Sequence, residues 1–304
     1  MSQLILLVGP PGSGKTTLAT TEFQGYHRVS QDDQGKEGHK EIFNKLLTEG
    51  HNIIVDRINH TQEQRSRYLL PAKEAGYQTK IVVLHQPFSE CLERCSNRTD
   101  HPSIKSRETA SKALHGFFKA YERVTDHEAD VVDRRYHSDE YKRKIPCVVF
   151  DIDNTMADNK HREHYMQEGK KDWKGFFSQM HNDKVVPAVQ FLYQMVETFN
   201  MSLKENCSDD WNDYLVPIFC SARPDDYRKV TKEWLCENGV GWYDRLIMRG
   251  RNDYRRDDLV KEQMLDFEIL PRYKVEFWCD DRDQVVSKIR SRGIPVFQVA
   301  PGEF

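Results

Sequence analysis

The stretch Gly9-Pro10-Pro11-Gly12-Ser13-Gly14-Lys15-Thr16 fits the pattern Gly-x-x-x-x-Gly-Lys-Ser/Thr at every fixed position. An apolar run precedes it at residues 4–8 and a helical segment follows it, which is the context of a phosphate-binding loop. Glycines let backbone N–H groups point at phosphate oxygens, and the helix N-terminus adds the positive end of its dipole. The pattern predicts that ATP or another nucleoside triphosphate binds here with Mg²⁺. The expected nucleotide-binding residues are Gly9, Gly12, Ser13, Gly14, Lys15, Thr16 and Thr17, with Lys15 on the β- and γ-phosphates and Thr16 on Mg²⁺.

Apolar runs alternate with helical patterns through the rest of the chain. In the first half, strands are expected at residues 4–8, 27–31, 52–56 and 80–85, and helices at 40–47 and 105–123. In the second half, strands are expected at residues 147–150, 216–220, 245–248, 275–279 and 296–299. Such repetition predicts parallel sheets covered by helices. We expect a two-domain α/β protein, residues 1–140 and 141–304, with the polar segment 125–144 as the connection.

The composition limits the classes of protein to which the chain can belong. Its 304 residues are enough for two domains, and no run approaches the roughly 18 apolar residues of a membrane helix. The N-terminus lacks the features of a secretory signal, and seven cysteines, an odd number, favour a reduced cytoplasmic protein. The net charge of −3 argues against a protein that binds a long nucleic-acid backbone.

A candidate acceptor site accompanies the phosphate-binding loop. Asp32 or Asp33 follows the strand expected at residues 27–31, and the ends of parallel strands meet at one edge of a sheet, so either carboxylate can take a proton from an attacking hydroxyl. Arg94 and Arg98 are four residues apart and share one helix face. They are expected to close over the nucleotide phosphates as a lid and to neutralise charge in the transition state.

A second constellation begins with Asp151-Ile152-Asp153-Asn154-Thr155, directly after an expected strand. Two carboxylates at a strand end suit Mg²⁺, with Asp151 as the nucleophile on phosphorus and Asp153 as the general acid and base. Later elements supply groups for the same chemistry. They are Ser221 and Arg223 for the phosphate, Lys261 as a further cation, and Asp280 and Asp281 as carboxylates for the metal.

The order of these groups resembles that of the haloacid dehalogenase superfamily across roughly residues 145–304, with Asn154 where glycine is most frequent. The whole chain resembles the bacteriophage polynucleotide 5′-kinase/3′-phosphatases. The most specific matching pieces are residues 9–17, 32–33, 94–98, 151–157, 254–261 and 280–286. The resemblance implies a P-loop domain followed by a haloacid-dehalogenase-like domain with a small cap, which here is the charged segment 158–185.

The resemblance also implies an activity and roles for single residues. Asp32 activates a 5′-OH, Arg98 binds the nucleotide phosphates, and Asp151 becomes an aspartyl-phosphate. The expected substrates are RNA or DNA ends that carry a 5′-OH, a 3′-phosphate or a 2′,3′-cyclic phosphate. A ligase is expected to act on the products, and the protein is expected to be a homotetramer. One position departs from the family. Gly35 stands where the family has an arginine for the acceptor's 3′-side phosphate, so either Lys36, Arg28 or Arg57 makes that contact or the acceptor preference differs.

Two other functions fit the same residues. A nucleoside or other small-molecule kinase can be joined to a metabolite phosphatase, and the loss of the acceptor arginine favours this alternative. A nucleotide-dependent binding protein without enzymatic activity is the third hypothesis, against which the intact charged residues of both sites argue.

Overall fold

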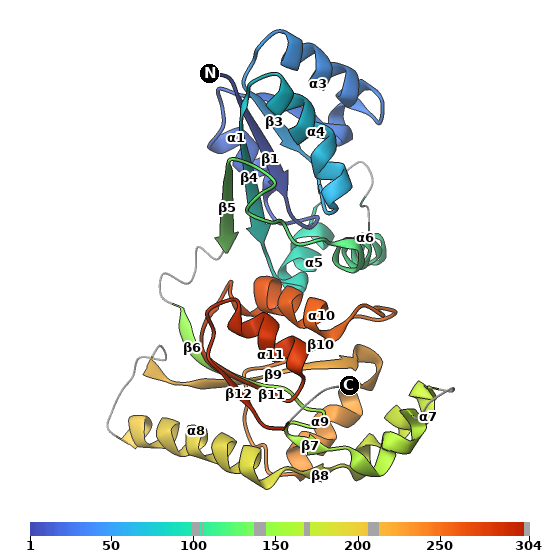
Figure 1. The fold of residues 1–304 in the computed structure, drawn as a ribbon, viewed down its shortest axis with the longest axis vertical. Coiled ribbons are helices and arrows are strands. Elements are labelled where there is room, and N and C mark those ends of the chain that lie inside the picture. The colour runs from blue at the N-terminus through green and yellow to red at the C-terminus, as the bar shows by residue number, and fades with distance from the viewer. Residues whose placement is uncertain (99–103, 105, 137–143, 167–170, 206–212, 301–304) are drawn as a thin grey trace. The chain divides into compact units, whose positions relative to one another are not determined.

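The computed structural model describes residues 1–98, 104, 106–136, 144–166, 171–205 and 213–300. The chain forms two compact units, Met1–His137 and Ser138–Phe304 (Figure 1). Each unit contains one five-stranded parallel sheet with helices packed against it, so the predicted α/β class is confirmed. The expected boundary between residues 140 and 141 lies outside the described residues. Within the described residues, no helix is long and apolar enough to cross a membrane.

The sheet of the first unit has the strand order β2-β3-β1-β4-β5, and all neighbouring strands are parallel. The strands are β1 (Gln3–Val8), β2 (His27–Ser30), β3 (Ile53–Asp56), β4 (Gln78–His85) and β5 (Val131–Tyr136). The helices are α1 (Lys15–Thr21), α2 (Gln31–Gln34), α3 (Gly38–Thr48), α4 (Gln62–Glu74), α5 (Phe88–Ser96) and α6 (Arg107–Ala120). Central β1 is buried from Leu4 to Val8, as expected for a strand covered on both faces.

The strand order brings three polar segments to one edge of this sheet. β1 ends at Val8 and continues into the glycine-rich loop, while β3 lies between β1 and β2. Ser30 of β2 is in register with Asp56 of β3. The first residue of α2 and Arg57 therefore both follow directly after a strand, at the carboxyl edge of the sheet. The parallel topology thus gathers the loop and the predicted acceptor aspartates at one place.

The prediction that residues 125–144 form only a connection is wrong for residues 131–136. These residues form the edge strand β5, which pairs with β4 over six register positions. An edge strand has only one neighbour and keeps charged side chains, and here Lys80 and Arg135 both pair with Asp133. The alternation of apolar and polar residues was therefore too weak to indicate a strand. Helix α6 is also shorter than the expected 105–123. It begins at Arg107, because Ser106 caps it by accepting a hydrogen bond from the backbone N–H of Thr109, and it ends at Ala120.

The sheet of the second unit has the order β10-β9-β6-β11-β12 and is also parallel throughout. The strands are β6 (Ile145–Phe150), β9 (Val216–Pro224), β10 (Arg245–Arg249), β11 (Tyr273–Asp280) and β12 (Val296–Gln298). The helices are α8 (Pro187–Glu205), α9 (Arg228–Glu237), α10 (Asp257–Met264), which continues into a π turn at Leu265–Ile269, and α11 (Asp283–Arg290). Two apolar clusters form its core, one containing Trp278 and the other Trp234.

A small cap lies between β6 and β9 in the sequence, where the resemblance placed it. Two short antiparallel strands, β7 (Ala157–Asp158) and β8 (Lys184–Val185), enclose it. The cap contains one short helix, α7 (Trp173–Ser178), and 3₁₀ turns at Lys160–Met166 and Met180–Asn182. Each of these pieces is too short to be stable alone. The buried side chains of Phe176, Phe177 and Met180 pack together and hold the pieces in place.

Candidate active sites

The glycine-rich loop of the first unit is shaped by two residues with left-handed backbone. Gly12 has φ 81° and Gly14 has φ 91°, a conformation that side chains with a Cβ rarely adopt. A Cβ at Gly12 would lie 2.7 Å from the carbonyl oxygen of Cys91 and 2.9 Å from Sγ of Cys95. A Cβ at Gly9 would lie 2.7 Å from Oγ of Ser13. At Gly12 the loop therefore packs against α5 so closely that only glycine fits.

Lys15 is the cation of this loop. Its ammonium donates to the carbonyl oxygens of Gly9 at 2.9 Å and Pro10 at 2.8 Å, and to Oγ of Ser13 at 3.4 Å. Burial lowers the pKa of Lys15 to about 8, against the opposing effect of the Asp56 carboxylate. The neutral oxygens around the ammonium compensate its charge only in part. A bound phosphate group supplies the missing negative charge, which fits the predicted role of Lys15.

Thr16 and Thr17 stand exposed in the first turn of α1. The hydroxyl of Thr16 donates to Oδ2 of Asp56 at 2.8 Å, and Nε of Arg28 donates to the same oxygen at 2.8 Å. A hydroxyl and a carboxylate at the phosphate loop are the oxygen ligands that Mg²⁺ prefers, so these residues fit the ion. No role was predicted for Asp56. Its position at a strand end was the only available signal, since its partner Thr16 lies 40 residues away.

The two candidate acceptor aspartates have different surroundings. Asp33 forms an ion pair with Arg28, whose NH1 lies 2.6 Å from its Oδ2. Asp32 is exposed on the four-residue helix α2, directly beyond the end of β2. The role of Asp32 in accepting a proton from a hydroxyl stays a prediction.

The predicted lid arginines lie at the end of α5. Arg94 is exposed and pairs with Glu90 at 3.8 Å. Arg98 follows the C-cap Asn97, and its charge adds to burial in lowering the pKa of Lys15, so Arg98 lies within electrostatic reach of the loop. Closure of the lid stays a prediction.

The centre of the second site is an ion-paired lysine between two strand ends. Lys261 of α10 places its Nζ 2.8 Å from Oδ1 of Asp151 and 2.7 Å from Oδ2 of Asp280. All three side chains are buried, and Nε1 of Trp278 donates to the same oxygen of Asp280 at 3.0 Å. The two carboxylates raise the pKa of Lys261 despite its burial. Lys261 therefore stays charged and fixes the two aspartates at the carboxyl edge of the sheet.

Three carboxylates of this site can hold a metal ion. One ligand oxygen from each of Asp151, Asp280 and Asp281 lies within 4.8 Å of the others. Burial and the neighbouring aspartates raise the pKa of Asp151 well above its usual range, and burial together with Asp280 raises the pKa of Asp281 to about 6. Lys261 alone does not compensate three negative charges. A buried donor set consisting only of oxygens with excess negative charge fits Mg²⁺.

Asp153 belongs to a separate ion network. Its carboxylate accepts hydrogen bonds from Arg223, at 2.8 Å to each oxygen, and from Arg162 at 2.5 Å. Both arginines also bind Asp183, at 2.6 Å for Arg162 and 3.0 Å for Arg223. Although burial pushes the pKa of Asp153 upward, the two guanidinium groups hold it well below its usual range. The carboxylate of Asp153 thus lies outside the group of three that fits the metal.

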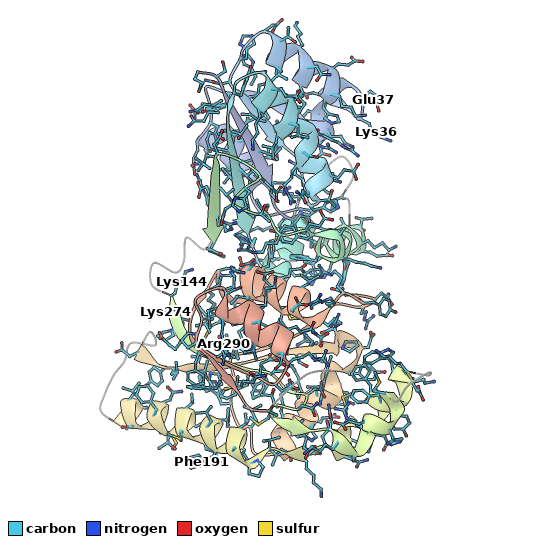
Figure 2. All side chains as sticks on the ribbon, viewed as in Figure 1. Lys36, Glu37, Lys144, Phe191, Lys274 and Arg290 are labelled. Atoms are coloured by element: carbon cyan, nitrogen blue, oxygen red, sulfur yellow. The ribbon has the colours of Figure 1, made fainter. Side chains whose placement is uncertain are left out.

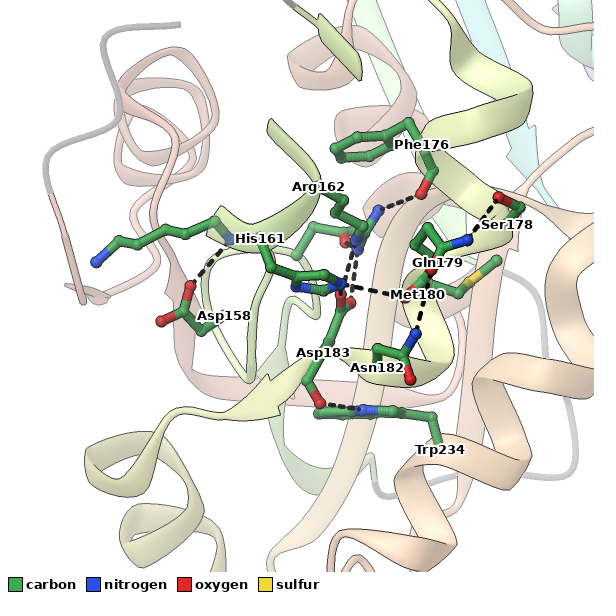
Figure 3. A network of polar contacts seen from close by, with 12 residues as sticks. Asp158, His161, Arg162, Phe176, Ser178, Gln179, Met180, Asn182, Asp183 and Trp234 are labelled. Carbon is green, nitrogen blue, oxygen red and sulfur yellow. Dashed lines mark hydrogen bonds and ion pairs between the residues drawn. The ribbon is translucent and has the colours of Figure 1, made fainter. Parts of the chain in front are cut away.

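Arg162 and Asp183 of the cap were not identified from the sequence. Arg162 is fully buried, with its guanidinium carbon 4.1 Å from the centre of the Phe176 ring. Asp183 accepts from Nε of Arg162 at 2.7 Å, and its backbone carbonyl accepts from the indole of Trp234 at 2.8 Å (Figure 3). No local pattern reveals such partners, because each contact joins segments that are distant in the sequence.

Ser221 and a group of ion pairs around Asp257 complete the surroundings of the second site. Ser221 of β9 is fully buried and its Oγ accepts from the backbone N–H of Arg223 at 3.2 Å. Nearby, Asp257 at the start of α10 pairs with both Arg249 and Arg282. Nε of Arg249 donates to the carbonyl oxygen of Ala222 at 2.8 Å. This frame connects β9, β10 and α10, and it sets the position from which Lys261 reaches the aspartates.

Comparison with known proteins gives two family matches. The polynucleotide kinase PNKP phosphatase domain matches residues 145–304, just over half of the chain, and an AAA domain matches residues 35–124. Transcription factor bHLH140 of Arabidopsis thaliana is 38% identical over 110 residues, which cover 32% of this chain and 12% of that protein. The chain therefore spans only a small part of that relative.

Two solved structures are among the matches. A chain of the Pnkp1/Rnl/Hen1 complex is 23% identical, and the match covers 100% of this chain and 98% of that chain with a TM-score of 0.42. Kti12 of Chaetomium thermophilum in complex with ADP-AlF3 is 17% identical, and the match covers 43% of this chain and 88% of that chain with a TM-score of 0.33.

Proposed function

The chain belongs to the polynucleotide kinase PNKP phosphatase-domain family, and from this premise we propose that it is a bifunctional enzyme that heals broken nucleic-acid ends. One activity transfers the γ-phosphate of ATP to a 5′-OH, and the other removes a 3′-phosphate. The observation that supports both is the presence of two separate phosphate-chemistry centres. One is the glycine-rich loop with Lys15, and the other is the carboxylate group around Lys261.

The kinase reaction is assigned to residues 1–140. The loop and Lys15 bind the β- and γ-phosphates, and Arg98 adds positive charge where the transferred group moves. Asp32 takes the proton of the 5′-OH while the 5′-oxygen bonds to the γ-phosphorus. The bond between the γ-phosphorus and the bridging oxygen breaks, and ADP leaves. Thr16 and Asp56 would hold Mg²⁺, which neutralises phosphate charge when bound.

The phosphatase reaction is assigned to residues 141–304. A carboxylate oxygen of Asp151 bonds to the phosphorus, the bond to the 3′-oxygen breaks, and Asp153 gives that oxygen a proton. This role requires Arg223 to leave Asp153 for the phosphate when substrate binds, because Arg223 and Arg162 hold the pKa of Asp153 low in the free protein. Asp153 then takes a proton from the water that releases phosphate from Asp151. Ser221, Arg223 and Lys261 hold the phosphate oxygens. Asp151, Asp280 and Asp281 would hold Mg²⁺, which offsets the negative charge of nucleophile and substrate when bound.

The two activities complement each other at a strand break. A kinase and a phosphatase acting on the same hydroxyl would cancel, but on opposite ends they leave a 5′-phosphate and a 3′-OH, which are the ends that a ligase joins. An enzyme that holds only strand ends needs few basic residues, which agrees with the net charge of −3.

We further infer a reducing cytoplasmic setting and a homo-oligomer. Six cysteines among the described residues are free and form no disulfide. Phe191 is 64% exposed on the outer face of α8, and Met195 and Phe199 follow at helical spacing with similar exposure (Figure 2). An exposed apolar stripe of this kind is typical of an interface, and the mass of the protein in solution tests it.

The proposal is tested by labelled phosphate transfer from ATP to matched RNA and DNA oligonucleotides with 5′-OH ends, and by phosphate release from 3′-phosphate ends. We expect both activities with Mg²⁺. A nucleoside kinase joined to a metabolite phosphatase is the second candidate, and Gly35 at the family's arginine position favours it. Transfer to free nucleosides without transfer to oligonucleotides would establish that alternative.

A further inference from the structure

A half-buried cation without a carboxylate partner stands at the acceptor edge of the first unit. Arg57 follows the last residue of β3. Its NH1 donates to the hydroxyl of Tyr68 at 2.7 Å, and its NH2 donates to Oε1 of Gln31. Both partners are uncharged, and within the described part of the chain no carboxylate pairs with it. Arg28 differs, because it pairs with both Asp33 and Asp56.

The position of Arg57 relative to the proposed base follows from the sheet register. Ser30 is paired with Asp56, so Gln31 and Arg57 are the first residues beyond the ends of two neighbouring parallel strands. The hydrogen bond from Arg57 to Gln31 places the guanidinium beside the first turn of α2, which also carries Asp32. The hydrogen bond between Thr16 and Asp56 brings the nucleotide loop to the same edge.

A chain of hydrogen bonds fixes Arg57 and α2 together. Nδ1 of His39 lies 2.8 Å from the carbonyl oxygen of Gly35, which only accepts, so Nδ1 carries the proton. Burial lowers the pKa of His39, and in the neutral ring Nε2 accepts from the hydroxyl of Tyr68 at 3.0 Å. That hydroxyl accepts in turn from Arg57. The helix that carries Asp32 is thereby held at both of its ends, through Gln31 and Gly35.

We propose that Arg57 binds the first phosphodiester of the acceptor strand and thereby makes the kinase select a polynucleotide end over a nucleoside. The inference rests on the proposed kinase function. Two of the five guanidinium N–H groups are used by Tyr68 and Gln31, which leaves donors for two phosphate oxygens. A phosphate also supplies the counter-charge that the half-buried guanidinium lacks.

The other two candidates for this contact are less suitable. Arg28 already pairs with two carboxylates. Lys36 is exposed and projects from the surface next to Glu37 (Figure 2). Gly35 has φ 76°, a backbone conformation that disfavours an arginine at that position. The geometry therefore favours a phosphate contact from Arg57, at the end of β3, over one from Gly35 in the loop after α2.

The test compares two oligonucleotides with 5′-OH ends, one with a normal first linkage and one with an uncharged methylphosphonate there. The full chain is used, and kcat/KM of phosphate transfer is measured. For the natural protein, the methylphosphonate is expected to lower kcat/KM by about 10- to 100-fold, the usual effect of losing a hydrogen-bonded charge. In Arg57→Gln, activity on the normal linkage falls by a similar factor and the two acceptors become equivalent. Arg57→Lys restores part of the discrimination.

Lys36→Gln is the matched control, because it removes one charge from the same edge. It should retain the full discrimination, and the KM for ATP and the phosphatase activity should stay unchanged in all three variants. The proposal is overturned if Arg57→Gln discriminates as well as the natural protein, or if Lys36→Gln abolishes the discrimination. A natural protein that phosphorylates no oligonucleotide contradicts the proposed function itself, which separates the two failures.

Discussion

At the scale of single residues, the two buried lysines that we assign to phosphate chemistry differ in their surroundings. Lys15 is surrounded by neutral oxygens, and burial lowers its pKa to about 8. Lys261 is equally buried, but Asp151 and Asp280 raise its pKa. The first lysine is ready to bind a negative charge that comes with the nucleotide. The second already has its negative charges and acts mainly by fixing them in place.

Nucleotide binding should take up a proton in alkaline solution. Lys15 is charged in the free protein below a pH of about 8 and loses its proton above it, whereas bound phosphates raise its pKa again. We expect uptake of roughly one proton per nucleotide at pH 9 and little at pH 7. Calorimetry in buffers of different ionisation enthalpy measures this number. Equal uptake at both pH values would show that Lys15 is not the responsible group.

Magnesium dependence of the phosphatase should change near pH 6. Burial and Asp280 raise the pKa of Asp281 to about 6, so this carboxylate becomes protonated as the pH falls through that value and no longer binds a cation. The Mg²⁺ concentration for half-maximal phosphate release should therefore be several-fold higher at pH 5.5 than at pH 7.5. Asp281→Asn should need high Mg²⁺ at both pH values. An unchanged requirement in the natural protein would contradict the assignment.

At the scale of elements, the sequence was informative wherever the chemistry lies within one segment. The glycine-rich loop and the pair Asp151 and Asp153 were identified because their spacing is local, and parallel strands place all such ends at one edge. Asp56, Arg162 and Asp183 were missed because their function depends on partners from other elements. The edge strand β5 was missed for a related reason, since its only neighbour is β4 and its pattern is mostly polar.

The cap should contribute to both stability and phosphatase activity through Arg162. Replacing Arg162 with Met leaves the buried Asp183 with Arg223 alone, which is expected to cost about 3–5 kcal/mol of unfolding free energy. The phosphatase rate should fall by about 100-fold, because Asp153 loses one of its two positioning partners. Denaturant titration and phosphate release measure these effects. Arg67→Met, at an exposed pair with Glu63, is the control and should change neither.

At the scale of the whole molecule, two units of the same architecture carry different chemistry at the carboxyl edges of their sheets. The first unit has the glycine-rich loop and Lys15, which we propose bind phosphates. The second has a group of buried carboxylates, and we propose that Asp151 among them attacks phosphorus. In the proposed function, part of the acidity of the second half comes from carboxylates of the phosphatase site, so the net charge of −3 does not exclude a nucleic-acid substrate.

The central claim is that one chain holds two independent sites that act on opposite ends of a strand. Mass spectrometry of a single oligonucleotide with a 5′-OH and a 3′-phosphate, incubated with ATP and Mg²⁺, tests it most directly. The natural protein should give a 5′-phosphate and a 3′-OH, Lys15→Ala only the 3′-OH, and Asp151→Asn only the 5′-phosphate. An unchanged oligonucleotide with the natural protein, or loss of both products in either folded variant, would contradict the claim.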